Sequence, residues 1–220
     1  MDIFPKIEGS VADWDVIVHG HLRWNRFFGE SAENPPRGDP STCGSALITG
    51  KLADGSVYRL LVDPTLHGDA QGLDFSVNRR TGLHLSDVTH CFSTHHHADH
   101  VDGLLYLPGA KWLAPQGVID AIADEGFRAK LCPAFGEFLP GVVAVPLPGH
   151  TAALHGVAFS FGGKRMLVAG DAIMSRHHFA ACRTEFQDDP MLIARAEQSI
   201  RDIKESFDVV LPGHDNLILL

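Results

Sequence analysis

A dense tract of imidazole and carboxylate groups, HHHADH over residues 95–100, constrains this chain more than any other sequence feature. It directly follows a β-branched and aromatic run that is typical of a buried strand. Residues two apart on an extended segment point the same way, so His95 and His97 can bind one ion. If the chain then enters a helix, Asp99 and His100 face a second position. The pattern favours a metal site at a strand end over the alternative of a solvated polar loop.

Three later strand-like runs end in the same residue types, and each has a glycine immediately before the polar side chain: Gly149-His150, Gly170-Asp171 and Gly213-His214. Glycine lets the backbone turn tightly as it leaves a strand. Functional groups of α/β folds collect at strand ends. We therefore expect these three side chains to converge on the histidine tract.

The rest of the sequence alternates between strand-like and helix-like segments. Strands are expected at 15–19, 45–48, 57–62, 88–94, 111–114, 141–151, 154–161, 164–172 and 207–215, and helices at 70–82, 115–127 and 189–206. Hairpin turns are predicted at Asp54-Gly55 and Gly162-Gly163, and Gly82 is expected to end the first helix. Because strands come in hairpins and also alternate with helices, a mixed α/β sandwich is predicted, with sheets inside and helices outside.

Composition excludes several classes. The 220 residues predict a single domain, 1–220, and the formal net charge of −9 is unfavourable for nucleic-acid binding, so no nucleic-acid partner is expected. No apolar run is long enough to predict a membrane span, and the N-terminal residues lack the apolar region of a secretory signal. Four widely spaced cysteines predict reduced thiols. A cytoplasmic protein with a small-molecule substrate is therefore expected.

Taken in order, the segments THHHADH, PGHT, GDA and PGHD over residues 45–216 resemble the metallo-β-lactamase-fold hydrolase superfamily. The resemblance implies a four-layer αββα sandwich with a dinuclear metal site at one edge of its sheets. It implies three sets of ligands: His95, His97 and His150 for the first metal; Asp99, His100 and His214 for the second; and Asp171 as a bridge between them.

Two positions depart from the superfamily pattern. Asp102 stands where a glycine is common after the Asp-His pair, and Leu154 stands where a polar residue often follows the third histidine. Both departures leave the implied ligand set intact.

The resemblance also narrows the activity. True β-lactamases of the superfamily place cysteine at the position of Asp171 or lack part of the ligand set. Glyoxalase II-like thioesterases carry a helical C-terminal extension, and the nucleases usually carry a second domain; neither is expected for this sequence. Compact lactonases and esterases are therefore the closest in outline.

Five imidazoles and two carboxylates without a thiolate favour Zn²⁺, with Fe and Mn as alternatives. Two such ions hold a water that loses a proton near neutral pH and attacks as a bridging hydroxide, while Asp99 orients it or accepts its proton. The implied activity is hydrolysis of an ester-like bond in a lactone, carboxylic ester or thioester. The alternatives are a phosphodiesterase or nuclease on the same fold, a non-hydrolytic iron-dependent member, and a metal cage that only stabilises the fold.

Further residues are candidates for the surroundings of the site. Asp63 ends a strand and is expected to orient a ligand histidine. Substrate contacts are considered for His155 and for His178 in a predicted loop, against the alternative of ordinary polar positions. Trp24 and Phe28 form either a hydrophobic wall over the metals or part of the core. The final NLILL is expected to pack on the core or in a homodimer interface.

Overall fold

The computed structural model describes residues 4–21, 42–65, 70–184 and 189–220. Twelve strands form two six-stranded sheets in this part of the chain. The first sheet contains β1 (Asp13–Val18), β2 (Ser45–Lys51), β3 (Val57–Val62), β4 (His90–Phe92), β5 (Lys111–Ala114) and β6 (Leu131–Pro133), in that order. The second contains β7 (Gly136–Leu139), β8 (Val142–Pro146), β9 (His155–Phe161), β10 (Lys164–Gly170), β11 (Val209–Pro212) and β12 (Ile218–Leu219), also in chain order.

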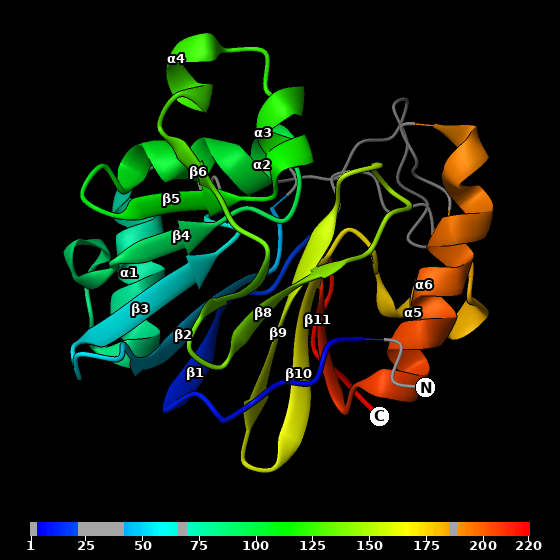
Figure 1. The fold of residues 1–220 in the computed structure, drawn as a ribbon, viewed down its shortest axis with the longest axis horizontal. Helices are drawn as coiled ribbons and strands as arrows, with labels where there is room; N and C mark the ends of the chain where they lie inside the picture. Colours follow the sequence, from blue (N-terminus) through cyan, green and yellow to red (C-terminus); the bar gives the residue numbers. More distant parts are fainter. Residues whose placement is uncertain (1–3, 22–41, 66–69, 185–188) are drawn as a thin grey trace.

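Helices lie on the outer faces of the two sheets, which gives the predicted four-layer αββα sandwich (Figure 1). On the first sheet are α1 (Ala70–Thr81), α2 (Ala98–Val101), α3 (Gln116–Ala121) and α4 (Glu125–Arg128). On the second are α5 (Arg176–Ala181) and α6 (Ile193–Ser206). Both the fold class and the layer order predicted from the sequence are confirmed.

Strand alternation builds three apolar layers between these four. Along β3, Leu60 and Val62 face the second sheet, whereas Leu61 between them faces the helices of the first. The same alternation on β10 sends Val168 to the layer between the sheets and Leu167 to the layer under α5 and α6. Successive side chains of a strand point to opposite faces, so each sheet buries both of its sides.

Strand directions bring five strand ends to one edge of the sandwich. β3 to β6 run parallel, so β3 and β4 end side by side. In the second sheet β10 is parallel to β11, and two antiparallel pairings give β8 the same direction. The polar residues that follow β3, β4, β8, β10 and β11 are thereby gathered at this edge.

Local turn chemistry follows the sequence. Gly162 and Gly163 both adopt positive φ, 57° and 77°, in the β9–β10 hairpin, as a two-residue turn of this kind requires. Gly55 has φ 85° in the β2–β3 hairpin. Gly82 has φ 73° and its N–H donates to Asn78 O at the end of α1.

Other local predictions are wrong. The expected helix over 115–127 is two short helices, α3 and α4, because Asp124 caps a new helix by accepting the Phe127 N–H at 2.7 Å. The loop expected at 177–178 is part of α5, which begins after its N-cap Ser175. The short strands β6, β7 and β12 were not anticipated, and β4 is shorter than the expected 88–94.

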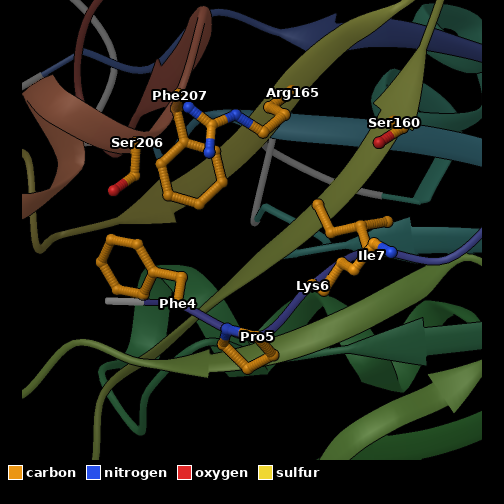
Figure 2. Close-up of a pocket in the computed structure, with 8 residues that line it drawn as sticks. All are labelled: Phe4, Pro5, Lys6, Ile7, Ser160, Arg165, Ser206 and Phe207. Carbon is orange, nitrogen blue, oxygen red and sulfur yellow. The ribbon is translucent and has the colours of Figure 1, made fainter. Parts of the chain in front are cut away.

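The two chain ends differ in how they pack. The Phe4 ring packs against the Phe207 ring at a tilt of 45°, with ring centroids 5.2 Å apart, and the N-terminal segment lines a partly open pocket of about 130 Å³ beside the end of α6 (Figure 2). Of the apolar C-terminus, Leu217 and Ile218 pack on the core, whereas Leu219 and Leu220 are exposed. No helix within the described ranges has both the length and the apolar character needed to cross a membrane.

Candidate metal centre

The strand-end side chains form two adjacent groups of metal-ligand type. One contains His95, His97, His150 and Asp171, and the other contains Asp99, His100 and His214. Within each group the candidate ligand atoms lie within 4.8 Å of one another. The division matches the two ion positions that the sequence implies, although the structure carries no ion.

Asp171 joins the two groups. Its Oδ2 lies 3.7 Å from His95 Nε2, 3.4 Å from His150 Nε2 and 3.3 Å from His214 Nε2. Its Oδ1 lies 3.2 Å from His100 Nε2. One buried carboxylate therefore faces histidines of both groups, as a bridging ligand would.

Three of the imidazoles are oriented from behind by other parts of the fold. Asp63 Oδ2 lies 2.9 Å from His100 Nδ1, and Thr42 O lies 3.0 Å from His214 Nδ1. The Thr94 hydroxyl donates to Asp63 Oδ2 at 2.8 Å, which leaves its oxygen to accept from His95 Nδ1 at 3.1 Å. When Nδ1 carries the proton, the Nε2 lone pair of each ring faces the cluster, which is the arrangement a metal-binding histidine needs.

The short distances between side chains of the cluster are explained better by bound cations than by hydrogen bonds between these side chains. His97 Nδ1 lies 3.1 Å from His95 Nε2 and 2.9 Å from His150 Nε2, but a ring nitrogen carries at most one proton and can donate to only one of them. His100 Nε2 and Asp171 Oδ1 are buried and lie 3.2 Å apart, but the described residues give neither atom a hydrogen bond of acceptable geometry. Buried polar atoms without such partners are uncommon and point to a missing ion or water. The donor set therefore fits two divalent cations.

The pKa values of the histidine rings in the cluster are shifted in different directions. Burial, reinforced by His100, holds the pKa of His95 well below its ordinary value, so this ring is neutral. Burial also opposes protonation of His100, but Cys43, Asp171 and Asp63 outweigh it and hold its pKa well above the usual range. Burial of Asp171 is likewise outweighed, here by His214 and His100, and its pKa lies well below the ordinary value. Protonation of His100 and metal binding by the same ring would compete, because a metal-binding imidazole must be neutral.

The glycines before the strand-end ligands serve mainly to make room. Only Gly170 has a left-handed backbone, with φ 51°, so the expected tight turn applies there alone. A Cβ on Gly213 would overlap Asp171 Oδ1, and one on Gly149 would lie 2.5 Å from Ala196 Cβ of α6. At these two positions the chain passes too close to its neighbours for any side chain.

Comparison with known proteins places this architecture in a family. The model of the metallo-beta-lactamase superfamily matches residues 52–214. The chain belongs to the metallo-β-lactamase superfamily. A search of curated proteins finds no significant match.

Solved structures share the fold of this superfamily member at low sequence identity. A Thermotoga maritima structure, whose name places it among the metallo-β-lactamases, has a TM-score of 0.69 at 15% identity, covering 94% of this chain and 99% of that one. A B. thuringiensis AiiA mutant with N-decanoyl-L-homoserine bound at its active site has a TM-score of 0.64 at 19% identity, with coverages of 90% and 89%. A Staphylococcus aureus structure named as a metal-dependent hydrolase has a TM-score of 0.63 at 16% identity, with coverages of 94% and 91%.

The other residues predicted to lie around the metal cluster differ in what the structure shows of them. The backbone N–H of His155 donates to Thr94 O at 3.0 Å, next to the candidate ligand His95. The ring of His155 instead contacts Ala153 O. His178 is buried on α5 with its Nδ1 2.8 Å from Ser175 Oγ. Neither belongs to the two ligand groups. Trp24 and Phe28 lie outside the described residues, so their predicted role as a wall stays a prediction.

Sequence reasoning missed Cys43, which lies directly behind the second ligand group. This thiol is fully buried and donates to Asp99 O at 3.0 Å and toward Asp63 O at 3.5 Å. Its backbone N–H donates to Thr65 Oγ1 at 3.3 Å. A lone Cys-Gly pair before a strand carries no signal of such a position, because the contacts come from segments distant in sequence.

Proposed function

We propose that this chain is a dinuclear metal-dependent hydrolase that cleaves an ester-like bond of a small molecule: a lactone, a carboxylic ester or a thioester. The observation that carries the proposal is the position of Asp171 between two groups of candidate ligands. The superfamily match supports hydrolysis as the general class. The bound N-decanoyl-L-homoserine of the AiiA mutant supports a small acylated substrate, by analogy of fold alone.

His95, His97 and His150 would hold one ion, His100, His214 and Asp99 the other, and Asp171 both. Bound metal would supply Lewis acidity toward a carbonyl oxygen and would lower the pKa of a bound water toward neutrality. With no thiolate among the donors, Zn²⁺ is the favoured ion and Fe or Mn are alternatives.

Asp99 is the group that we assign to proton handling. Its side chain is 25% exposed, whereas Asp171 beside it is 4% exposed, so Asp99 faces the side from which water and substrate can arrive. Its Oδ2 lies 3.5 Å from His214 Nε2 and 3.8 Å from His100 Nε2. In this position the carboxylate can orient an attacking water and accept its proton, which typically contributes about 10²- to 10⁴-fold to the rate.

The buried residues behind the cluster would act by keeping it rigid. Asp63 holds His100 and, through two further bonds, the backbone N–H and the hydroxyl of Thr94. Because Thr94 in turn contacts His95, one carboxylate positions a ligand of each group. Such supporting contacts fix ring orientation and keep the ligand nitrogens aimed at one place.

Metal analysis combined with a substrate screen tests the proposal. We expect two metal ions per chain and turnover of at least one class among lactones, p-nitrophenyl esters and thioesters. Turnover should be lost on chelation and regained with Zn²⁺, Mn²⁺ or Fe²⁺, and His97→Ala and Asp171→Ala should lose both metal and activity. Preferential cleavage of bis-p-nitrophenyl phosphate would support the phosphodiesterase alternative, and full activity without metal would overturn the proposal.

A further inference from the structure

A cysteine and a lysine meet between α5 and α6, on the outer face of the second sheet and separate from the metal cluster. Cys182 Sγ lies 2.9 Å from Lys204 Nζ. The same amine donates to Ala180 O at 3.3 Å and lies 4.8 Å from the centre of the Phe179 ring. These contacts hold the nitrogen beside the sulfur, whereas an ordinary surface lysine samples many positions.

Cys182 occupies an unusual backbone position. It caps the C-terminus of α5 in the left-handed region with φ 49°, where glycine is the common residue. Its thiol packs against the apolar layer under α5 and α6 yet remains half-buried. The residue is therefore partly open to a small oxidant, with its sulfur beside the Lys204 amine.

We propose that Cys182 and Lys204 form a peroxide-sensitive modification site in which the oxidised thiol is captured by the amine. Hydrogen peroxide first oxidises the thiol to a sulfenic acid, as one oxygen is transferred to sulfur and one water leaves. Sulfur loses two electrons and peroxide gains them. The Lys204 ammonium gives one proton to solvent before the next step.

The free amine then attacks the sulfenic sulfur. An S–N bond forms, the S–OH bond breaks, and the departing hydroxide takes the second proton from nitrogen as water. In the net reaction the thiol and the amine each lose one hydrogen, and one peroxide becomes two waters. An added thiol reverses the link by attacking sulfur and releasing the amine.

The link would add a covalent bond between two helices that pack together and share the hydrogen bond from Lys204 to Ala180 O. α5 begins beside the metal cluster, because the Arg176 N–H donates to Asp215 Oδ2 at 3.0 Å and the His214 N–H donates to Met174 O at 2.9 Å. Cys182 and Lys204 are 22 positions apart in sequence. Closing a loop of this length restricts the unfolded chain, so the linked form should melt about 10 °C higher.

Mass spectrometry of the full chain tests the site. The protein is treated with hydrogen peroxide, its remaining thiols are alkylated, and it is digested without reductant. We expect a peptide containing Cys182 joined to one containing Lys204, lighter than their sum by two hydrogens and separated by dithiothreitol. Cys132 provides a matched control, since it is also half-buried and has no hydrogen bond to a lysine amine among the described residues.

The Lys204→Arg variant distinguishes capture of the sulfenic acid by the amine from oxidation of the thiol alone. Arginine keeps the positive charge and can stack on Phe179, but its guanidinium is a poor nucleophile. In this variant dimedone should trap a sulfenic acid at Cys182, with no linked peptide and no peroxide-dependent rise in melting temperature. Cys182→Ser removes the reactive sulfur and provides a second variant if Lys204→Arg folds poorly. The proposal is overturned if Cys182 oxidises equally in wild type and Lys204→Arg without a linked peptide, or if Cys132 links to lysine as efficiently.

Discussion

The Asp63 carboxylate lies 2.9 Å from His100 Nδ1 and accepts two further hydrogen bonds from Thr94, from its backbone N–H and its hydroxyl. All three residues are fully buried. Asp63 itself has φ 47°, a left-handed backbone that aspartate and asparagine adopt more readily than other non-glycine residues. This carboxylate therefore connects the end of β3 to ligands in both halves of the cluster.

Asp63→Asn tests that connection with little change in shape. Asparagine tolerates the same backbone and can still accept from Thr94, but it removes the negative charge that orients His100. Metal affinity should fall by about 10- to 100-fold, mainly at the position served by His100. Competition with a chromophoric chelator measures the two affinities. Unchanged affinity at both positions would show that Asp63 only supports the fold.

The convergence of the candidate ligands could be predicted from the sequence because each of these side chains directly follows a strand-like run. His150, Asp171 and His214 needed only the expectation that strand ends meet at one edge. Cys43 and Thr42 could not be found this way, because their contacts with Asp99 and His214 join segments that share no local pattern. Strand hairpins that alternate with helical segments predicted the mixed α/β sandwich, and the family resemblance implied its four layers, whereas the break between α3 and α4 depended on one capping interaction at Asp124.

The glycines illustrate a second limit. A glycine before each ligand predicted tight turns, but Gly213 is needed because of a neighbour, Asp171, that is distant in sequence. Only the assembled structure shows that requirement. A need for backbone freedom can be inferred from the identity of one residue. A close approach between two segments can be recognised only when the positions of both are known.

Gly213→Ala should therefore damage the site without touching a ligand. The new Cβ would overlap Asp171 Oδ1 and displace the carboxylate that faces both groups. Metal affinity should fall by about 100-fold, with secondary structure by circular dichroism unchanged. Gly109→Ala is the matched control, since its Cβ would meet no atom within 4 Å and its φ is not left-handed. Equal metal binding by the two variants would contradict the predicted overlap.

The four thiols should differ in how fast they are alkylated. Burial raises the pKa of Cys43 to about 11, with smaller contributions from neighbouring groups, and burial alone raises that of Cys91 further. At about pH 8, roughly one Cys43 thiol in a thousand is ionised, and that one is shielded from solvent. Iodoacetamide should label the half-buried Cys132 and Cys182 in the native protein, and all four thiols after denaturation. Labelling of native Cys43 as fast as Cys132 would show that the region behind Asp99 opens.

A pH dependence is expected on the surface, away from the metal cluster. His84 Nδ1 lies 3.0 Å from Asp74 Oδ2, and this hydrogen bond, with the charge of Asp74, raises the pKa of His84 above its ordinary 6.5. The pKa of Asp74 is lowered, first by the Leu85 N–H and then by His84. A raised histidine pKa means that the contact stabilises the fold fully below pH 6.5 and is lost as pH rises through the folded-state value. At acidic pH the stabilising contribution of Asp74 is lost in turn, as pH falls through the lowered pKa of that carboxylate.

Histidine NMR measures this directly, with the His84 signals assigned through His84→Gln. The wild-type ring should titrate above pH 6.5, and Asp74→Asn should return it to the ordinary value. Asp120→Asn is the control, because that carboxylate is exposed and accepts from Gln116 on α3 rather than from His84. Thermal melts should show the same pattern: wild type loses stability relative to Asp74→Asn as pH rises through the His84 transition. A His84 pKa unaffected by Asp74→Asn would mean that the ion pair does not persist in solution.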